Sequence, residues 1–181
     1  QNVGEMRMCY HRAIPTDAEI KHIVLKRVGE RWYVCLMLKL PDTGIHQVQT
    51  DQQIGIDVGL KNLAALSTGE LIENPHWLRE SLAKLRRLQR HASRQVKGSN
   101  HQRKTYHQIA RLHEHVANQR ADFLHKISHR LIAGNDLIAI ENLSPRFMNR
   151  NRHLSLSSHD AGFGLFRQML EYKAESAGIQ V

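Results

Sequence analysis

A short apolar stretch that contains a single acid, residues 54–62, places the strongest constraint on how this chain can fold. Ile54, Ile56 and Val58 alternate along it, which indicates a strand with a buried face. Asp57 interrupts this apolar run, and an unpaired carboxylate is costly in an apolar environment. A metal ion, a hydrogen-bonded partner or a cleft open to water would each allow the acid to remain there.

A second stretch, residues 136–143, repeats the pattern, because its apolar run also finishes on an acid, Glu141. Two core strands that each carry a carboxylate could hold a metal site between them. Such a pair suits Mg²⁺ or Mn²⁺, which accept carboxylates together with water and phosphate oxygens. Two ions about 3.5–4 Å apart can hydrolyse a phosphodiester. We therefore predict that Asp57 and Glu141 are metal ligands and catalytic residues; for Asp57 alone, a structural role is the alternative.

The order of the remaining elements predicts how these two strands pair. Strand-like runs at 63–67 and 70–72 follow the Asp57 strand and indicate three consecutive antiparallel strands. A long helical region, the Glu141 strand and a further helix come next, and residues 179–181 resemble the beginning of another strand. This order fits an α/β fold with the mixed sheet of ribonuclease-H-like (RuvC) domains. Its first and fourth strands lie side by side and parallel, which would make the two acids neighbours.

The helical region, about residues 76–133, is expected to be an inserted antiparallel hairpin, because a Gly-Ser-Asn break at 98–100 separates two helical patterns. Its polar surface is basic, since Glu80 and Glu114 are the only acids in the stretch 79–120. A solvated helix surface is the alternative, but a net charge of +9 and a pI near 9.9 favour a polyanionic partner. The residues that we expect to contact nucleic acid are Lys61, Arg86, Arg87, Arg90, Arg94, Lys97, Arg103, Lys104, Arg111 and Arg120.

The polar residues at 41–53 are expected to link two domains, 1–50 and 51–181. In the first domain, the runs 20–28 and 31–40 predict two strands joined by a two-residue connection. The second of these runs alternates in a way that predicts a half-buried antiparallel strand.

Four further side chains have simple structural interpretations. Cys9 and Cys35 are not in metal-binding spacing and are expected to be reduced thiols inside a core. Trp32 and Trp77 are expected to be core or interdomain anchors rather than platforms for base stacking.

Five segments resemble the transposon-encoded TnpB family, which is related to the type V CRISPR effector nucleases. They are GIDVGLKN at 55–62, RRLQR at 86–90, ANQRADFLHK at 117–126, IENL at 140–143 and DAGFG at 160–164. The resemblance implies a RuvC-like nuclease that an RNA guides to DNA, in the cytoplasm of a bacterium or archaeon. It implies that Asp57 and Glu141 are the first two catalytic acids. It also implies that residues 1–50 belong to a wedge β-barrel that holds the guide RNA.

The chain departs from the family at its C-terminal side. In the family, the third catalytic Asp lies past a four-cysteine zinc ribbon, and this sequence includes neither, so Zn²⁺ is expected only downstream. Asp160 matches a different family position and is expected to cap a helix. We therefore expect a fragment of an RNA-guided DNA endonuclease that binds DNA and guide RNA but does not cleave alone.

Two other functions are compatible with parts of the sequence. A non-catalytic RNA- or DNA-binding module would need only the positive charge. An actin-like or sugar-kinase ATPase also has an Asp-x-Gly turn after its first strand, but Leu60 stands where those proteins have a hydroxyl residue. A membrane location is not expected, because no apolar run approaches the roughly 20 residues needed to cross a bilayer.

Overall fold

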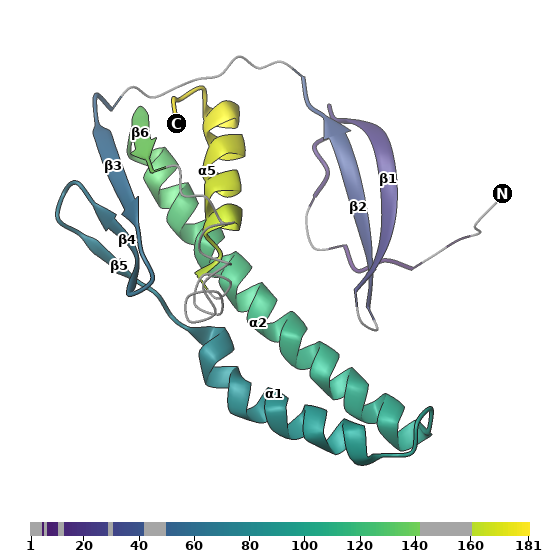
Figure 1. Cartoon of the computed structure of the whole chain (residues 1–181). Helices are drawn as coiled ribbons and strands as arrows, with labels where there is room; N and C mark the ends of the chain where they lie inside the picture. Colours follow the sequence, from purple (N-terminus) through teal and green to yellow (C-terminus); the bar gives the residue numbers. More distant parts are fainter. Residues whose placement is uncertain (1–4, 6, 11–12, 29–30, 42–49, 142–160) are drawn as a thin grey trace. The chain divides into compact units, whose positions relative to one another are not determined.

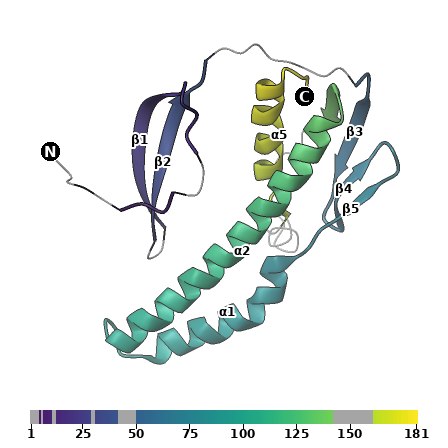
Figure 2. The same ribbon diagram turned by 180° about the vertical axis from the view of Figure 1, so that it is seen from behind.

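The chain divides into two compact units, Gln1–Gly44 and Ile45–Val181, and each is considered by itself. The computed structural model (Figures 1 and 2) describes residues 5, 7–10, 13–28, 31–41, 50–141 and 161–181.

Two antiparallel strands form the first unit within these ranges. Strand β1 (Glu19–Val28) pairs with β2 (Arg31–Lys39), so that Arg27 lies opposite Trp32. The guanidinium carbon of Arg27 lies 5.8 Å from the centroid of the Trp32 ring, at a cation–π distance. The two predicted strands are therefore confirmed.

The burial predicted for this unit is wrong. Trp32 exposes 67% of its surface, and Cys9 and Cys35 are exposed rather than buried in a core. Leu36 is among the few β2 residues that are even half-buried. The alternation in β2 correctly predicted a strand. It did not predict burial, because a sheet of two strands needs a second layer of structure packed on it to bury a face.

A mixed sheet organises the second unit. Its strands are β3 (Gln53–Val58), β4 (Asn62–Leu66), β5 (Leu71–Glu73) and β6 (Leu137–Ile140), in the spatial order β5-β4-β3-β6. The first three are antiparallel neighbours, whereas β3 and β6 are parallel. The predicted α/β class, the mixed sheet and the parallel pairing are therefore confirmed (Figure 1).

The described residues of this unit also contain the helices α1 (Trp77–Arg94), α2 (Asn100–Ala133) and α5 (Phe163–Ala177). Helices α1 and α2 run back along each other as a hairpin (Figures 1 and 2). Gly134 is the C-cap of α2. No helix in these ranges has the length and apolar character needed to cross a bilayer.

Glycines bound helix α5 at both ends. The helix begins after Gly162, whose φ is 69°, and its N-cap makes no side-chain hydrogen bond. Asp160, which we expected to cap this helix, lies outside the described residues. Gly178, with φ 70°, ends the helix in the left-handed conformation that glycine adopts readily. Beyond it, Gln180 forms a parallel bridge with Leu137, in agreement with the strand beginning expected at 179–181.

Helices α2 and α5 cover one face of the sheet and form the core with it (Figures 1 and 2). The largest fully buried side chains come from the sheet and from both helices, and packing among them is what holds the helices against the strands. They include Leu63 and Ile138 from the sheet, Leu124 from α2, and Phe166 and Leu170 from α5.

The start of β6 is fastened to the segment that precedes β3. The Asp136 carboxylate accepts hydrogen bonds from the backbone N–H groups of Thr50 (2.8 Å) and Asp51 (2.7 Å). The backbone N–H of Asp136 donates to the Gln52 carbonyl at 2.9 Å. Bonds to a charged acceptor are stronger than neutral ones, so Asp136 helps to set the register between β3 and β6.

Lys173 joins α5 to α2. Its Nζ donates to the backbone carbonyl of His125 and to Ser128 Oγ, each at 2.7 Å. Burial lowers the pKa of the Lys173 ammonium from its ordinary value. The two acceptors satisfy the desolvated group, so a polar contact supplements the apolar packing between the helices.

Replacing Phe166 by Ala should destabilise the second unit, because the ring is fully buried between α5 and the sheet. We expect the free energy of unfolding to fall by about 3–5 kcal/mol. Urea denaturation followed by the helical circular dichroism signal measures this. Leu165→Ala, at a neighbouring position with 38% exposure, is the control and should change stability far less. Similar losses in both variants would contradict the described packing of α5.

Candidate functional site

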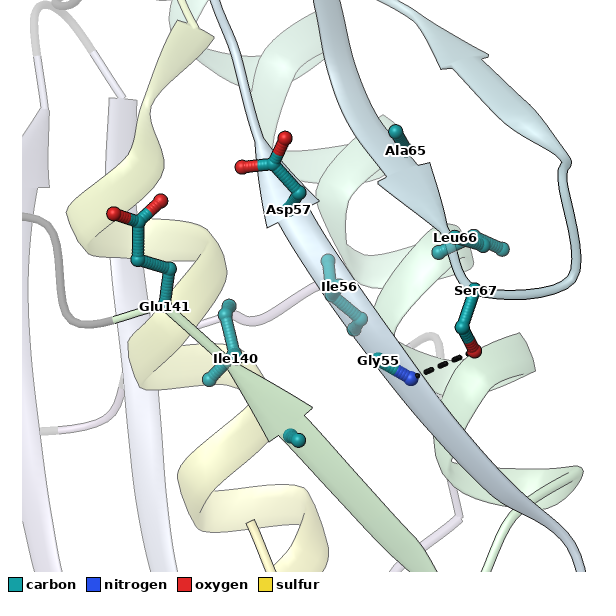
Figure 3. A pocket seen from close by; sticks show the side chains of 9 residues that line it. Gly55, Ile56, Asp57, Ala65, Leu66, Ser67, Ile140 and Glu141 are labelled. Carbon is teal, nitrogen blue, oxygen red and sulfur yellow. Dashed lines mark hydrogen bonds between the residues drawn. The ribbon is translucent and has the colours of Figure 1, made fainter.

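The two predicted catalytic acids lie side by side on the face of the sheet opposite the helices. Ile56 is buried in the core, so the next residue, Asp57, points to the other face. Ile56 is paired with Ile140, and the Glu141 backbone N–H donates to the Ile56 carbonyl at 3.4 Å. Asp57 on β3 and Glu141, which directly follows β6, therefore occupy matching positions, and Figure 3 shows both carboxyl groups on the same side.

An open pocket of about 480 Å³ has Asp57 and Glu141 among the residues that line it. Three small residues, Gly55, Ala65 and Ala139, line it together with the acids. Figure 3 shows Gly55 and Ala65 beside Asp57. Ala65 is the cross-strand partner of Asp57, and Ala139 is the partner of Gly55. Side chains this short do not cover the neighbouring carboxylates, so a phosphate group has access to the acids from solvent.

Ser67 also lines this pocket and bonds to Gly55. Its Oγ accepts a hydrogen bond from the Gly55 N–H at 3.0 Å, and its own N–H donates to the Gly55 carbonyl at 2.9 Å. These bonds extend the pairing of β3 and β4 beyond the last ladder residue. The strand that presents Asp57 is thereby held on both sides.

The donor set of the pocket fits a hard divalent cation. Asp57 and Glu141 are exposed carboxylates, and no basic side chain of the described residues pairs with either. Mg²⁺ is commonly held by one or two carboxylates, with water and phosphate oxygens completing its shell. In the same ranges there is no group of three or more His, Cys, Asp or Glu that could hold a metal. The candidate metal centre is therefore a pair of carboxylates.

The basic hairpin (α1, α2 and the turn between them) presents nearly all of the predicted nucleic-acid-binding residues to solvent. The exposed members of the set are Lys61, which precedes β4, and the hairpin residues Arg86, Arg87, Arg90, Arg94, Lys97, Arg103, Lys104 and Arg111. Exposed like charges on one hairpin repel each other, and a polyanion would relieve that repulsion.

Arg120 is the exception in this set, because it is half-buried. A Cβ atom added to Gly162 would lie 2.8 Å from Arg120 Cδ, so the arginine stem packs directly against the residue that precedes α5. A larger residue at this position would have to displace the Arg120 side chain and would be strained by the positive φ of Gly162. The nucleic-acid contact predicted for Arg120 stays a prediction, and the arginine stem in addition packs α2 against the start of α5.

Sequence reasoning missed the residue that joins the hairpin to the Asp57 strand. The buried Asn74 side chain donates through Nδ2 to the Leu60 carbonyl at 3.4 Å and accepts from the His76 N–H at 3.3 Å. Leu60 follows the Asp57 strand and His76 is the N-cap of α1. An Asn-Pro pair is a recognisable helix start in a sequence. The hydrogen bond from Asn74 to Leu60 spans 14 positions, and no local sequence pattern predicts it.

Trp77 completes the base of the hairpin. Its ring meets Phe123 edge to face, with 5.4 Å between the centroids. Its predicted role as a packing anchor is confirmed by this contact between the start of α1 and the body of α2.

Comparison with protein families places these features in a known group. Residues 34–152 match the family described as "Probable transposase", which covers both acids and the whole basic hairpin. The chain belongs to this family, and its relatives support the TnpB family that the sequence motifs indicate.

Several curated relatives are similar over most of the chain. A Streptomyces pristinaespiralis protein named "Putative RNA-guided DNA endonuclease" is 38% identical, over 95% of this chain and 42% of its own length. The similarly named InsQ protein of Escherichia coli is 30% identical, over 99% of this chain and 48% of its own length. A Mycobacterium tuberculosis relative with the same description is 31% identical over 68% of this chain. The chain spans less than half the length of these relatives.

The carboxylate pair should bind Mn²⁺ or Mg²⁺ in a way that depends on both acids. Asp57→Asn and Glu141→Gln keep the shape of each side chain and remove one anionic ligand, so each should weaken binding by about tenfold or more. Isothermal titration calorimetry with Mn²⁺ measures this. Glu73→Gln, an exposed acid on β5, is the matched control and should bind as the unaltered chain does. Unchanged affinity in Asp57→Asn would remove the metal assignment.

Proposed function

We propose that this chain supplies two metal-binding carboxylates and a nucleic-acid-binding surface to an RNA-guided DNA endonuclease with a RuvC-like, ribonuclease-H-like fold. The observation that carries the proposal is the juxtaposition of Asp57 and Glu141 on parallel strands, on the open face of the sheet. The names of the relatives supply the substrate class, DNA, and the guide, RNA.

Asp57 and Glu141 would hold Mg²⁺ or Mn²⁺ on the exposed face of the sheet, where a phosphodiester has access. When bound, two such ions activate water and stabilise the leaving oxygen during hydrolysis. The protein's part is to keep both carboxylates adjacent and uncovered, which the strand pairing and the small neighbours Ala65 and Ala139 achieve. Because the described residues provide only this pair, we expect no cleavage by this chain on its own.

The basic hairpin would hold the nucleic acid whose backbone approaches the carboxylates. Contacts between Arg or Lys and phosphate release counterions, so the affinity depends on salt and little on sequence. Asn74 connects this surface to the segment that follows the Asp57 strand, so the two parts of the site would act on one bound strand. We further propose that residues 1–50 belong to a wedge-type β-barrel that contacts the guide RNA.

A non-catalytic module that binds RNA or DNA is the second candidate. The exposure of the basic residues and the net charge of +9 are sufficient for it, whereas the carboxylate pair would then have no role. The two candidates differ in whether a metal at Asp57 and Glu141 lies within reach of the bound nucleic acid.

The hairpin should show the salt dependence of a phosphate-binding surface. In EDTA, Arg86→Ala combined with Arg90→Ala should weaken binding to every sequence and lower the salt slope by about two. Fluorescence anisotropy of a labelled duplex at several salt concentrations measures both. Lys126→Ala removes a charge that is paired with Asp122 and should leave the slope unchanged. An unaltered slope in the double arginine variant would remove the hairpin from the interface.

Localised cleavage by Fe²⁺ tests whether metal and nucleic acid meet. Fe²⁺ placed in the carboxylate pair, with ascorbate and peroxide, should produce hydroxyl radicals that cut the bound DNA at a defined position. The cuts should disappear in Asp57→Asn and Glu141→Gln and persist in Glu73→Gln. Cuts of equal strength and position in all variants would favour the non-catalytic module.

A further inference from the structure

The end of the basic hairpin carries an exposed apolar side chain that neither the core nor the metal site uses. Val96 lies in the turn between α1 and α2, and 79% of its surface is exposed, the highest value among the large apolar residues described. A single exposed apolar residue is common on protein surfaces. The surroundings of Val96 decide whether this one has a function.

A hydrogen-bond network centred on Gln102 holds this turn in one conformation. The Gln102 side chain donates to the Ala92 carbonyl at 3.1 Å and accepts from the Gly98 N–H at 2.8 Å. Its backbone N–H donates to Ser99 Oγ at 3.2 Å, which caps α2. Gly98 has a φ of 80°, which glycine adopts without strain. Val96 is therefore displayed by an ordered turn, and ordering it on binding would cost little entropy.

Basic and aromatic side chains flank the displayed valine. Arg94 and Lys97 stand on either side of it in the chain, and Arg103 follows in α2. No acid among the described residues pairs with these three bases, and the first turn of α2 contains none. Tyr106, with 55% of its surface exposed, lies three residues after Arg103 and therefore on a neighbouring part of the same helix face.

This combination matches nucleotides whose bases are unpaired. Arginine and lysine neutralise phosphates in any nucleic acid. Apolar and aromatic side chains gain from contact with base faces, which a continuous duplex keeps stacked inside and a single strand leaves accessible. A duplex could use the charges at the tip, but it would leave Val96 and Tyr106 in water.

We propose that the hairpin tip (Arg94, Val96, Lys97, Arg103 and Tyr106) binds unpaired nucleotides, with the bases against Val96 and Tyr106 and the phosphates against the basic residues. The proposal rests on the proposed function in so far as the partner is a nucleic acid. It goes further by assigning separate contacts to the two parts of the hairpin. The rest of the basic surface holds backbone of any structure, whereas the tip selects strands that are open.

The test compares three labelled probes in EDTA: a single strand, the duplex of the same sequence, and that duplex with unpaired arms at one end. Fluorescence anisotropy gives the affinity of the full chain for each. Tyr106→Ala should weaken binding to the single strand and the forked duplex by roughly 5- to 150-fold, the range expected for the loss of base stacking. Val96→Ser should act in the same direction. Neither change should alter the affinity for the continuous duplex or the salt slope.

Matched variants separate stacking from charge and from folding. Tyr106→Phe keeps the ring and should retain the affinity of the unaltered chain. Tyr172→Ala removes an exposed tyrosine from α5 and should have no effect on any probe. Arg94→Ala with Lys97→Ala should weaken binding to all three probes. Circular dichroism should show unchanged helix content in every variant.

Two outcomes would overturn the proposal. Unchanged affinity for the single strand in both Tyr106→Ala and Val96→Ser would show that the tip does not contact bases. Equal losses for the single strand and the continuous duplex would show that the tip does not distinguish them. Either result, with salt-dependent binding retained, would leave the proposed function standing. If the unaltered chain bound none of the probes, the nucleic-acid surface in the proposed function would fail as well.

Discussion

The parallel pairing of β3 with β6 is the contact on which the candidate site depends. The two strands are far apart in the chain, and the hairpin lies between them, yet Ile56 and Ile140 are matched in register. A slip of one residue in either strand would turn that strand's acid toward the helices and an isoleucine toward water. Burial of the isoleucines under α2 and α5, together with the backbone contacts of Asp136, opposes such a slip.

Helix α2 connects this arrangement to the nucleic-acid surface. Its 34 residues extend over about 51 Å, so one rigid element belongs to the core at one end and to the hairpin tip at the other. Leu124 and Leu131 pack under the sheet, whereas Arg103 and Tyr106 lie near the N-terminal end. Because α2 is one continuous helix, the core that positions the two carboxylates also positions the hairpin tip.

Packing also changes what individual charged and polar residues can do. Arg120 has the same charge as its hairpin neighbours, but its aliphatic stem packs against Gly162. In the sequence, Asn74 resembles an ordinary turn residue. In the structure, hydrogen bonds of its side-chain amide join the segment after Asp57 to the N-cap of α1. Such residues are positioning elements: the carboxylates and the basic surface would be present without them, but their relative placement would be less well defined.

The local features can be read from the amino-acid sequence: which segments form strands and helices, where the acids interrupt apolar runs, where the charge is concentrated, and the family. These follow from periodicity and motif, because a strand or helix repeats its pattern over a few residues. The order of elements was also sufficient to predict the parallel pairing, since a long helical crossover permits it. Four features follow from the folded arrangement instead: the register of Asp57 against Glu141, the half-burial of Arg120, the link through Asn74, and the exposure of Trp32 and Cys35. The register, the packing and the hydrogen bond depend on which distant segment of the chain lies next to the residue. The exposure of a side chain depends on how much of the rest of the fold covers it.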